Sequence, residues 1–322
     1  MISLIKGLKI KSPKEILFNY GFYILFVILV ITYGVSSNLF LSFDNIILVL
    51  NSTVFILVVA TGVTVVMITG DFDLSFGSVA LLSAAVMALA VQADWPVGLA
   101  IVVGLLVGIV AGLVHGLLVA FLNMSSMLTT LGLLIAYRGV ALLITKGAAL
   151  MLPRVFKDIA LIKFSGITML FVISVAIMII LQIVLKKTRF GVQCYAVGCN
   201  EKSAKKIGIS VKKIKIIVFI ISGLCASITG LFLLSIFGLY QDSIGRGIEF
   251  TVVASIVIGG TSLLGGRGNI LPGTFFGVLL LYVIDNGLAL LNASPFIYPF
   301  VQGIVIFAAM YMDSLRTYRK IN

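Results

Sequence analysis

The chain has 322 residues, of which 61% are hydrophobic and only 11% are charged, with a formal net charge of +12. A soluble protein this apolar could not cover its surface, because soluble domains contain only about half apolar residues. The apolar residues form blocks of about 20, which is the length of a membrane-spanning helix, and not the alternating segments of a membrane β-barrel. The composition therefore predicts an all-α integral membrane protein.

The positive charge does not indicate nucleic-acid binding, because Lys and Arg cluster between the apolar blocks, as the positive-inside rule describes. No soluble domain fits between the blocks, so residues 1–322 are expected to form a single transmembrane domain. We expect about ten spans, near residues 18–36, 46–69, 74–92, 97–122, 127–145, 167–186, 214–236, 250–265, 270–291 and 296–313.

The first apolar block follows a basic stretch and fits a retained span better than the core of a cleaved signal peptide. That stretch contains Lys6, Lys9, Lys11 and Lys14. The cysteines have neither metal-ligand spacing nor the arrangement of a disulfide set, which predicts reduced structural thiols. They are Cys194, Cys199 and Cys225.

Residues 69–78 place two carboxylates, Asp71 and Asp73, between strongly apolar runs. A charge inside a membrane is costly, so both should lie at an interface, line water or be paired. One interpretation is a tight cytosolic turn in which Asp73 or Ser75 caps the next helix. The alternative is direct contact with a transported solute.

Four glycines recur at every fourth position in the span near 97–122, where they would form one smooth stripe for close helix packing. They are Gly104, Gly108, Gly112 and Gly116. His115, the one histidine of the sequence, sits beside this stripe and could bond across helices or face a cavity. Without companion ligands it does not predict a metal site.

Arg138 lies within the apolar segment near 127–145, where it must be paired or hydrated. It could bond backbone carbonyls or reach the membrane surface, or it could face a translocation path. Residues 146–166 fall on the outer side of the predicted topology and yet contain four basic residues, an exception to the orientation rule. These are Lys146, Arg154, Lys157 and Lys163.

The most basic segment runs from Lys186 to Lys215 and contains one acid, Glu201. Six predicted spans precede it and four follow it, so the segment and both tails are expected on the cytosolic side. The C-terminal tail is also basic, through Arg316, Arg319 and Lys320. Residues 200–206 suggest a short helix, because Asn200 can cap it and Glu201 suits its N-terminal end. This helix could dock into a partner, or the segment could be a solvated loop near anionic lipids.

Residues 259–269 are rich in glycine but lack the Lys followed by Ser or Thr of a phosphate-binding loop. Their glycines are expected to permit a sharp turn between two spans, with Pro272 at the start of the following helix. This interruption and the one at 69–78 lie in corresponding halves of the chain. Paired interruptions are a known indication of transporter repeats.

Four stretches resemble motifs of the ribose-type branch of bacterial ATP-binding cassette (ABC) permeases, over residues 40–313. They are residues 70–78; Thr130, Leu131 and Gly132 with Arg138 and Gly139; residues 188–209; and residues 258–277 with 286–288. The sequence departs from the family's usual pattern at four places: the additional Asp71, Ser126–Leu128 in place of Pro-Phe-Ile, His115 where Asn is frequent, and Cys199 where Gly is frequent.

The resemblance implies a type II importer-like permease fold with pseudo-repeated halves in the bacterial inner membrane. It also implies a second permease subunit, identical or paralogous, cytosolic ATPase subunits that carry ATP and Mg, and an extracytoplasmic sugar-binding protein. The chain itself would hold no cofactor and would not be an enzyme. The ATPase-coupling loop would lie at about 187–213, with Arg189, Phe190, Gly191, Tyr195, Gly198, Asn200, Glu201 and Ala204 as coupling residues.

The expected cargo is a monosaccharide, a ribose-like pentose or a hexose. A path for neutral polyols needs only scattered polar groups, and the candidates are Asn51, Thr64, Asp73, Ser75, His115, Arg138 and Asn286. A permease for nucleosides or autoinducer-2 is the alternative within the same architecture. An ion-coupled secondary transporter, with Asp71, Asp73 or His115 as ion-linked groups, is a different class. An intramembrane enzyme lacks support, because no nucleophile–base set is apparent.

Overall fold

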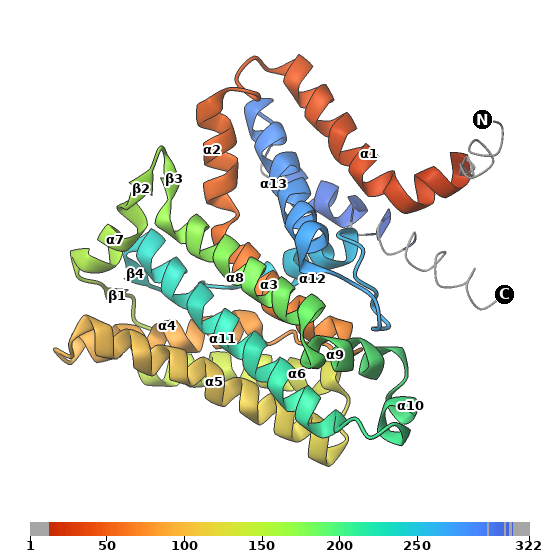
Figure 1. The fold of residues 1–322 in the computed structure, drawn as a ribbon. Coiled ribbons are helices and arrows are strands. Elements are labelled where there is room, and N and C mark those ends of the chain that lie inside the picture. Colours follow the sequence, from red (N-terminus) through yellow and green to blue (C-terminus); the bar gives the residue numbers. More distant parts are fainter. Residues whose placement is uncertain (1–12, 295, 306, 309–310, 312–322) are drawn as a thin grey trace, which may run out of the picture.

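The computed structural model describes residues 13–294, 296–305, 307–308 and 311, and within these it is almost entirely helical (Figure 1). The basic residues of both tails that entered the orientation argument, Lys14 apart, lie outside the described residues. The helices are α1 (Pro13–Ser36), α2 (Phe43–Ser52), α3 (Val54–Ile68), α4 (Phe76–Gln92), α5 (Val97–Leu122), α6 (Ser126–Thr145), α7 (Arg154–Leu161), α8 (Met169–Lys187), α9 (Arg189–Cys199), α10 (Glu201–Lys206), α11 (Val211–Phe237), α12 (Ile248–Ile258), η2 (Ile270–Thr274) and α13 (Phe275–Leu290).

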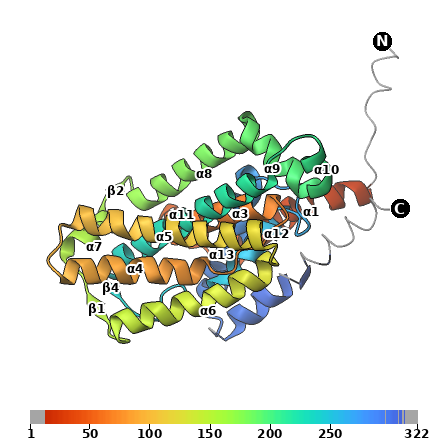
Figure 2. The ribbon, with the colours of Figure 1, turned by 90° about the horizontal axis from the view of Figure 1, so that it is seen from below.

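Helix α3 forms the centre of the structure. Every one of its residues except Phe55 is buried, which is expected of a helix that is apolar on all sides. It packs against α11 and α8, and α11 in turn packs along α5 (Figure 2). The core of the protein therefore lies between α3, α5 and α11, and the other helices surround it.

The predicted glycine stripe on α5 is confirmed as a close-packing surface. Gly108 lies against the Gly223 carbonyl and Ser227 of α11, while Gly112 and Gly116 face the α11 backbone. Gly104 instead meets the side chain of Met87 on α4. A side chain at any of these glycines would push α5 away from its neighbours, so the stripe determines how closely α5 approaches α11.

As far as the structure describes them, the ten predicted spans coincide with helical residues, but not all of these helices are long enough to cross a membrane. Among the described residues, five helices are long and apolar enough, and the pair α2–α3, bent by 47°, makes six. Helix α4 has 17 residues and α12 has only 11. At 1.5 Å per residue, the length of α12 is about half the thickness of the hydrocarbon core of a membrane. The span expected at 250–265 is therefore wrong in length, because glycines end α12 at Ile258.

The last expected span, 296–313, is described only in part, and residues 297–305 of it are helical. Proline was expected to start the helix after residues 259–269. Pro272 lies within η2, one turn before α13, so that expectation holds to within a few residues.

The two ends of the bundle differ in structure (Figure 1). At one end lie α7 and four two-residue strands: β1 (Leu150–Met151), β2 (Lys163–Phe164), β3 (Ile167–Thr168) and β4 (Leu239–Tyr240). Strand β1 pairs with β4 and β2 pairs with β3, both antiparallel. At the other end α9 and α10 form a short helical pair that connects α8 to α11.

Candidate functional site

Helices α9 and α10 exist as separate helices because polar side chains cap them. The Thr188 hydroxyl accepts a hydrogen bond from the Gly191 amide at 3.3 Å, and Asn200 Oδ1 accepts one from the Ser203 amide at 2.9 Å. The predicted helix after Asn200 is thus confirmed, with Asn200 at its N-cap. Gly191 packs against the α8 backbone at Leu185, which fixes the turn between α8 and α9.

Two loops meet beside α9. We call residues 69–75, between α3 and α4, the acidic loop, and residues 259–269, between α12 and η2, the glycine loop. The Gly266 amide of the glycine loop donates to the carbonyl of Ile68, just before the acidic loop, at 2.9 Å. Gly198 of α9 lies against both of these backbone groups. Helix α9 therefore contacts both interruptions of the chain at one point.

Tyr195 adds a second attachment of α9 to the glycine loop, because its hydroxyl donates to the Gly268 carbonyl at 2.8 Å. The backbone of the glycine loop turns with φ of +81° at Gly265 and +71° at Gly266, a region that side chains disfavour. The predicted sharp turn at these glycines is confirmed. Gly265 also packs against Gly70 of the acidic loop, so the two loops touch directly.

A row of alternating charges links the acidic loop to α10. Asp71 Oδ1 lies 3.4 Å from Lys215 Nζ, and Lys215 Nζ lies 3.1 Å from Glu201 Oε2. Glu201 Oε1 in turn lies 3.2 Å from Lys205 Nζ. The Asp71 and Lys215 side chains are only 8% and 14% exposed, so this part of the row is shielded from water.

The environment of Glu201 favours its ionised form. Partial burial by itself would raise the pKa of its carboxyl group, but hydrogen bonds and charge attraction from Lys215 and Lys205 outweigh this and lower the pKa below its usual value. Glu201 therefore stays negative through the neutral range and can hold α10 against α11.

Asp73 forms the buried polar centre of the acidic loop. Its Oδ1 accepts from the amide and the hydroxyl of Ser75, at 2.9 and 2.6 Å, and its Oδ2 accepts from Ser222 of α11 at 2.7 Å. Ser75 occupies the N-cap position of α4, yet its side chain makes no capping bond. Of the two expected caps, the one by Ser75 is therefore wrong, because its hydroxyl donates to Asp73, whereas Asp73 does accept the Ser75 amide at the start of the helix.

His115 completes this centre and is fully buried. Its Nε2 lies 3.3 Å from the Ser75 hydroxyl, and since that hydroxyl donates to Asp73, a ring N–H of His115 is the donor. The ring also packs near Tyr137 and Phe219, with centroids 5.5 and 6.0 Å away. His115 therefore bonds across helices, which was one of its two expected roles.

Helix α6 holds the acidic loop from a third side. The Ser126 hydroxyl accepts from the Phe72 amide at 3.0 Å, and the Thr130 hydroxyl accepts from the Leu74 amide at 3.2 Å. Asp71 and Asp73 have partners on α11, and Ser75 has one on α5. The acidic loop is a fixed element whose position depends on three helices.

The seven path candidates do not form one group. Asp73, Ser75 and His115 lie together, whereas the Thr64 hydroxyl meets that of Thr274 at 2.8 Å near the glycine loop. Arg138 donates to the backbone carbonyl of Asp242 at 3.4 Å, which is one of its expected alternatives.

The remaining two candidates bind other parts of the chain. Asn51 donates to the Gly166 carbonyl and accepts from the Thr168 amide, both at 2.9 Å. Asn286 exchanges two hydrogen bonds of 2.9 Å with Asn45, which joins α13 to α2. These bonds favour a structural role for both residues in this conformation.

The eight coupling candidates take different positions on the α9–α10 pair. Tyr195 and Gly198 face the glycine loop, Asn200 caps α10, Glu201 joins the charge row, and Gly191 and Ala204 are buried. Arg189 is exposed and Phe190 half-buried. Sequence reasoning did not single out Lys215 or Ser222, because their partners lie 144 and 149 residues away.

Within the described part of the chain, no group of three or more His, Cys, Asp or Glu side chains is placed to hold a metal ion. Cys194 and Cys225 are buried and Cys199 is exposed, all three as free thiols.

Comparison with known proteins finds similarity to permease components of transport systems. Residues 45–310 match the family model described as branched-chain amino acid transport system / permease component. The probable ABC transporter permease protein YphD of Escherichia coli (strain K12) is 34% identical over 304 residues, covering 93% of this chain and 90% of that protein. The ribose import permease protein RbsC of Bacillus subtilis (strain 168) is 37% identical over 289 residues, 89% of each chain.

A third relative is the autoinducer 2 import system permease protein LsrC of Photorhabdus luminescens. It is 32% identical over 281 residues, which is 87% of this chain and 85% of that protein. No solved structure matches the chain.

Proposed function

The chain belongs to the family of branched-chain amino acid transport system permease components, and on that premise we propose that it forms the translocation path of an ATP-driven importer for a monosaccharide. It is a multi-pass membrane permease of the ABC importer class, and it is not itself an enzyme. Permeases of this class work with ATPase and binding-protein partners. The proposal concerns its cargo, its topology and how it couples to the ATPase.

The observation that carries the proposal is the contact of α9 with both loops. A force applied to the α9–α10 pair reaches the acidic loop and the glycine loop together, through Gly198 and Tyr195. The charge row adds a second connection, from Glu201 through Lys215 to Asp71. We propose that the ATPase docks on α9 and α10 and that its nucleotide cycle moves both loops as one unit.

The two loops support a pseudo-repeated arrangement. Each follows a helix of the core, α3 or α12, and each precedes a further helix, α4 or α13. In the proposed topology the chain crosses the membrane ten times, with α4 and α12 as short crossing segments completed by irregular chain. Irregular backbone at membrane depth is tolerated where protein surrounds it, and here α5, α6, α9 and α11 surround the loops.

The proposed orientation puts α9, α10 and both tails in the cytosol of a bacterial cell, with the permease in the cytoplasmic membrane. The basic residues around the α9–α10 pair support it, while those at the opposite end of the bundle remain an exception. We propose that α7 and the short strands face the extracytoplasmic side, where a sugar-binding protein would deliver the cargo.

A second permease subunit, identical or paralogous, is also part of the proposal. Outward-facing apolar side chains on α5 and α6 suit contact with lipid or with another such subunit. Two groups of buried side chains are the proposed candidates for contact with the sugar. One is Thr64 of α3 with Thr274 of η2 and Thr261 of the glycine loop, and the other is Asp73, Ser75 and His115.

The relatives favour two cargo classes, because one is named for ribose and another for autoinducer-2. The proposed cargo is therefore a pentose or hexose, with autoinducer-2 or a nucleoside as the second candidate. Both classes present hydroxyl groups and neither needs a charged partner in the path. The uncharged hydroxyls of Thr64, Thr261 and Thr274 suit either of them.

The test is reconstitution in liposomes of the complex that co-purifies with this chain. We expect uptake of labelled ribose that requires ATP on the side of α9 and α10, and competition by unlabelled pentoses. Preferential competition by a nucleoside or by autoinducer-2 would transfer the assignment to that cargo. Uptake by the chain alone under a proton or sodium gradient would overturn the proposal.

A further inference from the structure

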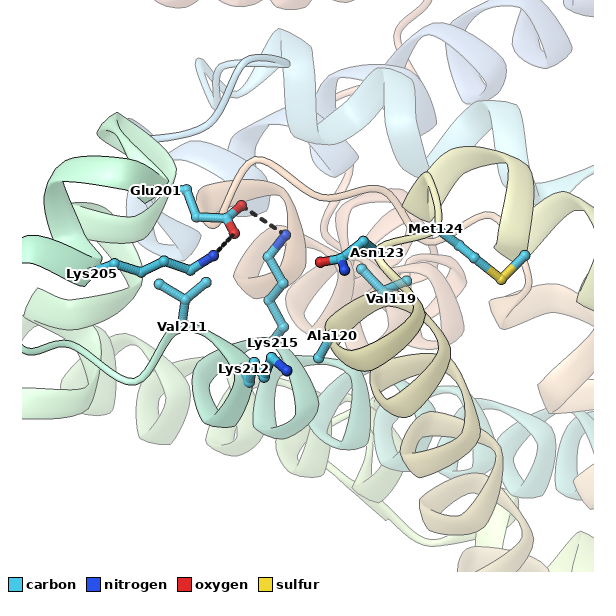
Figure 3. Close-up of a pocket in the computed structure, with 9 residues that line it drawn as sticks. All are labelled: Val119, Ala120, Asn123, Met124, Glu201, Lys205, Val211, Lys212 and Lys215. Atoms are coloured by element: carbon cyan, nitrogen blue, oxygen red, sulfur yellow. Dashed lines mark ion pairs between the residues drawn. The ribbon is translucent and has the colours of Figure 1, made fainter.

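A pocket of about 190 Å³ opens beside the α9–α10 pair, between the last turn of α5, the first turns of α11 and helix α10 (Figure 3). Glu201, Lys205 and Lys215 of the charge row form part of its wall, but the proposed coupling gives no role to the space between them. Its walls carry three lysines and one carboxylate: Lys205, Lys212, Lys215 and Glu201. The pocket is therefore basic, and the question is which anion it holds.

The cations of the pocket outnumber the carboxylates that neutralise them. Lys215 is shared between Glu201 and Asp71, and Lys205 pairs with Glu201. Lys212 makes no ion pair with any residue that the structure describes, and its Nζ lies instead 4.5 Å from the centre of the Phe121 ring. One of the three lysines that line the pocket thus has no carboxylate partner among the described residues, and it lies in the first turn of the 27-residue α11.

The surface next to the pocket is apolar and open. At the end of α5, Phe121 and Leu122 are 54% and 63% exposed, and Leu128 at the start of α6 is 70% exposed. Met124, which lines the pocket itself, is also exposed. An anion bound near Lys212 would therefore have an apolar surface beside it, which suits the acyl chains of a lipid better than a free ion in water.

We propose that this pocket binds the phosphate headgroup of an anionic phospholipid, with the acyl chains along Phe121, Leu122 and Leu128. Basic pockets between helices at the cytoplasmic surface are typical binding places for such headgroups. This inference rests on the proposed function in one respect: the proposed orientation places α10, and with it the pocket, at the cytosolic leaflet of the membrane. The bound phosphate pairs with Lys212 and competes with Glu201 for Lys205, so the lipid adjusts how firmly α10 is held.

The test measures lipid retention by the full chain in detergent micelles, without ATPase or cargo, by native mass spectrometry. The probes are phosphatidylglycerol, phosphatidylcholine and inorganic phosphate. We expect retention of phosphatidylglycerol over phosphatidylcholine, and a loss of about five-fold in affinity in Lys212→Gln, which removes one cation near the membrane surface. Lys212→Arg keeps the charge and should retain the lipid.

The matched control is Lys213→Gln, which removes an exposed neighbour that does not line the pocket. Equal retention of the two lipids, or equal loss in the Lys212 and Lys213 variants, overturns the proposal. Displacement of phosphatidylglycerol by inorganic phosphate at equal concentration overturns the lipid assignment in favour of a free anion. Because no transport is measured, a failure of the proposed function would appear only in the liposome assay and would leave this result unchanged.

Discussion

The acidic loop and the glycine loop occupy comparable places in the chain but are held by different forces. Side-chain hydrogen bonds and one buried ion pair fix the acidic loop, through Asp71, Asp73 and their partners on α6 and α11. Close backbone packing fixes the glycine loop, through Gly265 and Gly266 against Gly70 and α9. The position of the acidic loop therefore depends on electrostatic interactions and that of the glycine loop on close packing, although α9 contacts both.

Removal of the Asp73 carboxylate should destabilise the protein more than any other change considered below. Asp73→Ala leaves the Ser75 amide, the Ser75 hydroxyl and the Ser222 hydroxyl without their acceptor, all of them buried. Unpaired buried groups of this kind cost about 3 kcal/mol together. We expect a clearly lower unfolding temperature in detergent, measured by thermal aggregation, and loss of uptake.

The control for that variant is Asp158→Ala, at an exposed position within helix α7 where alanine is compatible with the backbone. If Asp73→Ala melted at the same temperature as Asp158→Ala, the acidic loop would not depend on its carboxylate, and the contrast between the loops would fail.

Addition of a methyl group at Gly198 should disrupt the backbone packing between α9 and the glycine loop. A Cβ at this position would collide with the Ile68 carbonyl and the Gly266 amide, which are backbone groups that cannot rotate away. Overpacking of this kind costs about 2 kcal/mol. Gly198→Ala should therefore lower both the unfolding temperature and uptake, whereas Gly132→Ala, which meets nothing within 4 Å, should lower neither.

Reversal of the charge at Glu201 tests the electrostatic link between the acidic loop and α10. In Glu201→Lys the substituted side chain repels Lys205 and Lys215, so α10 loses its attachment to α11. We expect normal membrane insertion and continued ATP hydrolysis by the complex, with uptake reduced about ten-fold, which corresponds to about 1.4 kcal/mol of coupling.

Lys202→Gln is the matched control, since Lys202 is an exposed neighbour of Glu201 on the same helix. Uptake by the Glu201 variant at the level of this control would show that the charge row carries no coupling. Loss of both hydrolysis and insertion would instead indicate a folding defect.

Acid titration should give the smallest effect. The folded-state pKa of Glu201 lies below its usual value of about 4.3, so the stabilisation it provides is fully present above that value and is lost as the pH falls through the folded-state pKa. Between pH 8 and pH 6 the stabilisation from Glu201 should therefore be complete and constant, so its effect on the unfolding temperature should not change with pH in this range. Below about pH 4 the difference between the wild type and Glu201→Gln should shrink; a constant difference would contradict this assignment.

Much of the local structure could be read from the sequence. The apolar blocks located the helices, the spacing of Gly104, Gly108, Gly112 and Gly116 indicated close packing, and Asn200 marked the start of α10. These features depend on residues within a few turns of each other, which is why a pattern in the chain can predict them.

The long-range partners could not be read in the same way. Nothing near Lys215 indicates that its amine lies between Asp71 and Glu201, and nothing near Asp73 points to Ser222. The span expected at 250–265 was overestimated because hydropathy continues past Ile258, while the glycines that follow turn the backbone. Hydropathy measures the solvent that a segment prefers and not its path.

By itself, the sequence determined that this chain lies in a membrane as helices, where those helices are, and where glycine or a capping side chain ends them, because each of these follows from local composition and backbone chemistry. Only the tertiary structure decided that two distant loops meet at α9 and that a row of charges joins one of them to α10. Those contacts depend on how α3, α5 and α11 pack, and packing selects partners across the whole chain.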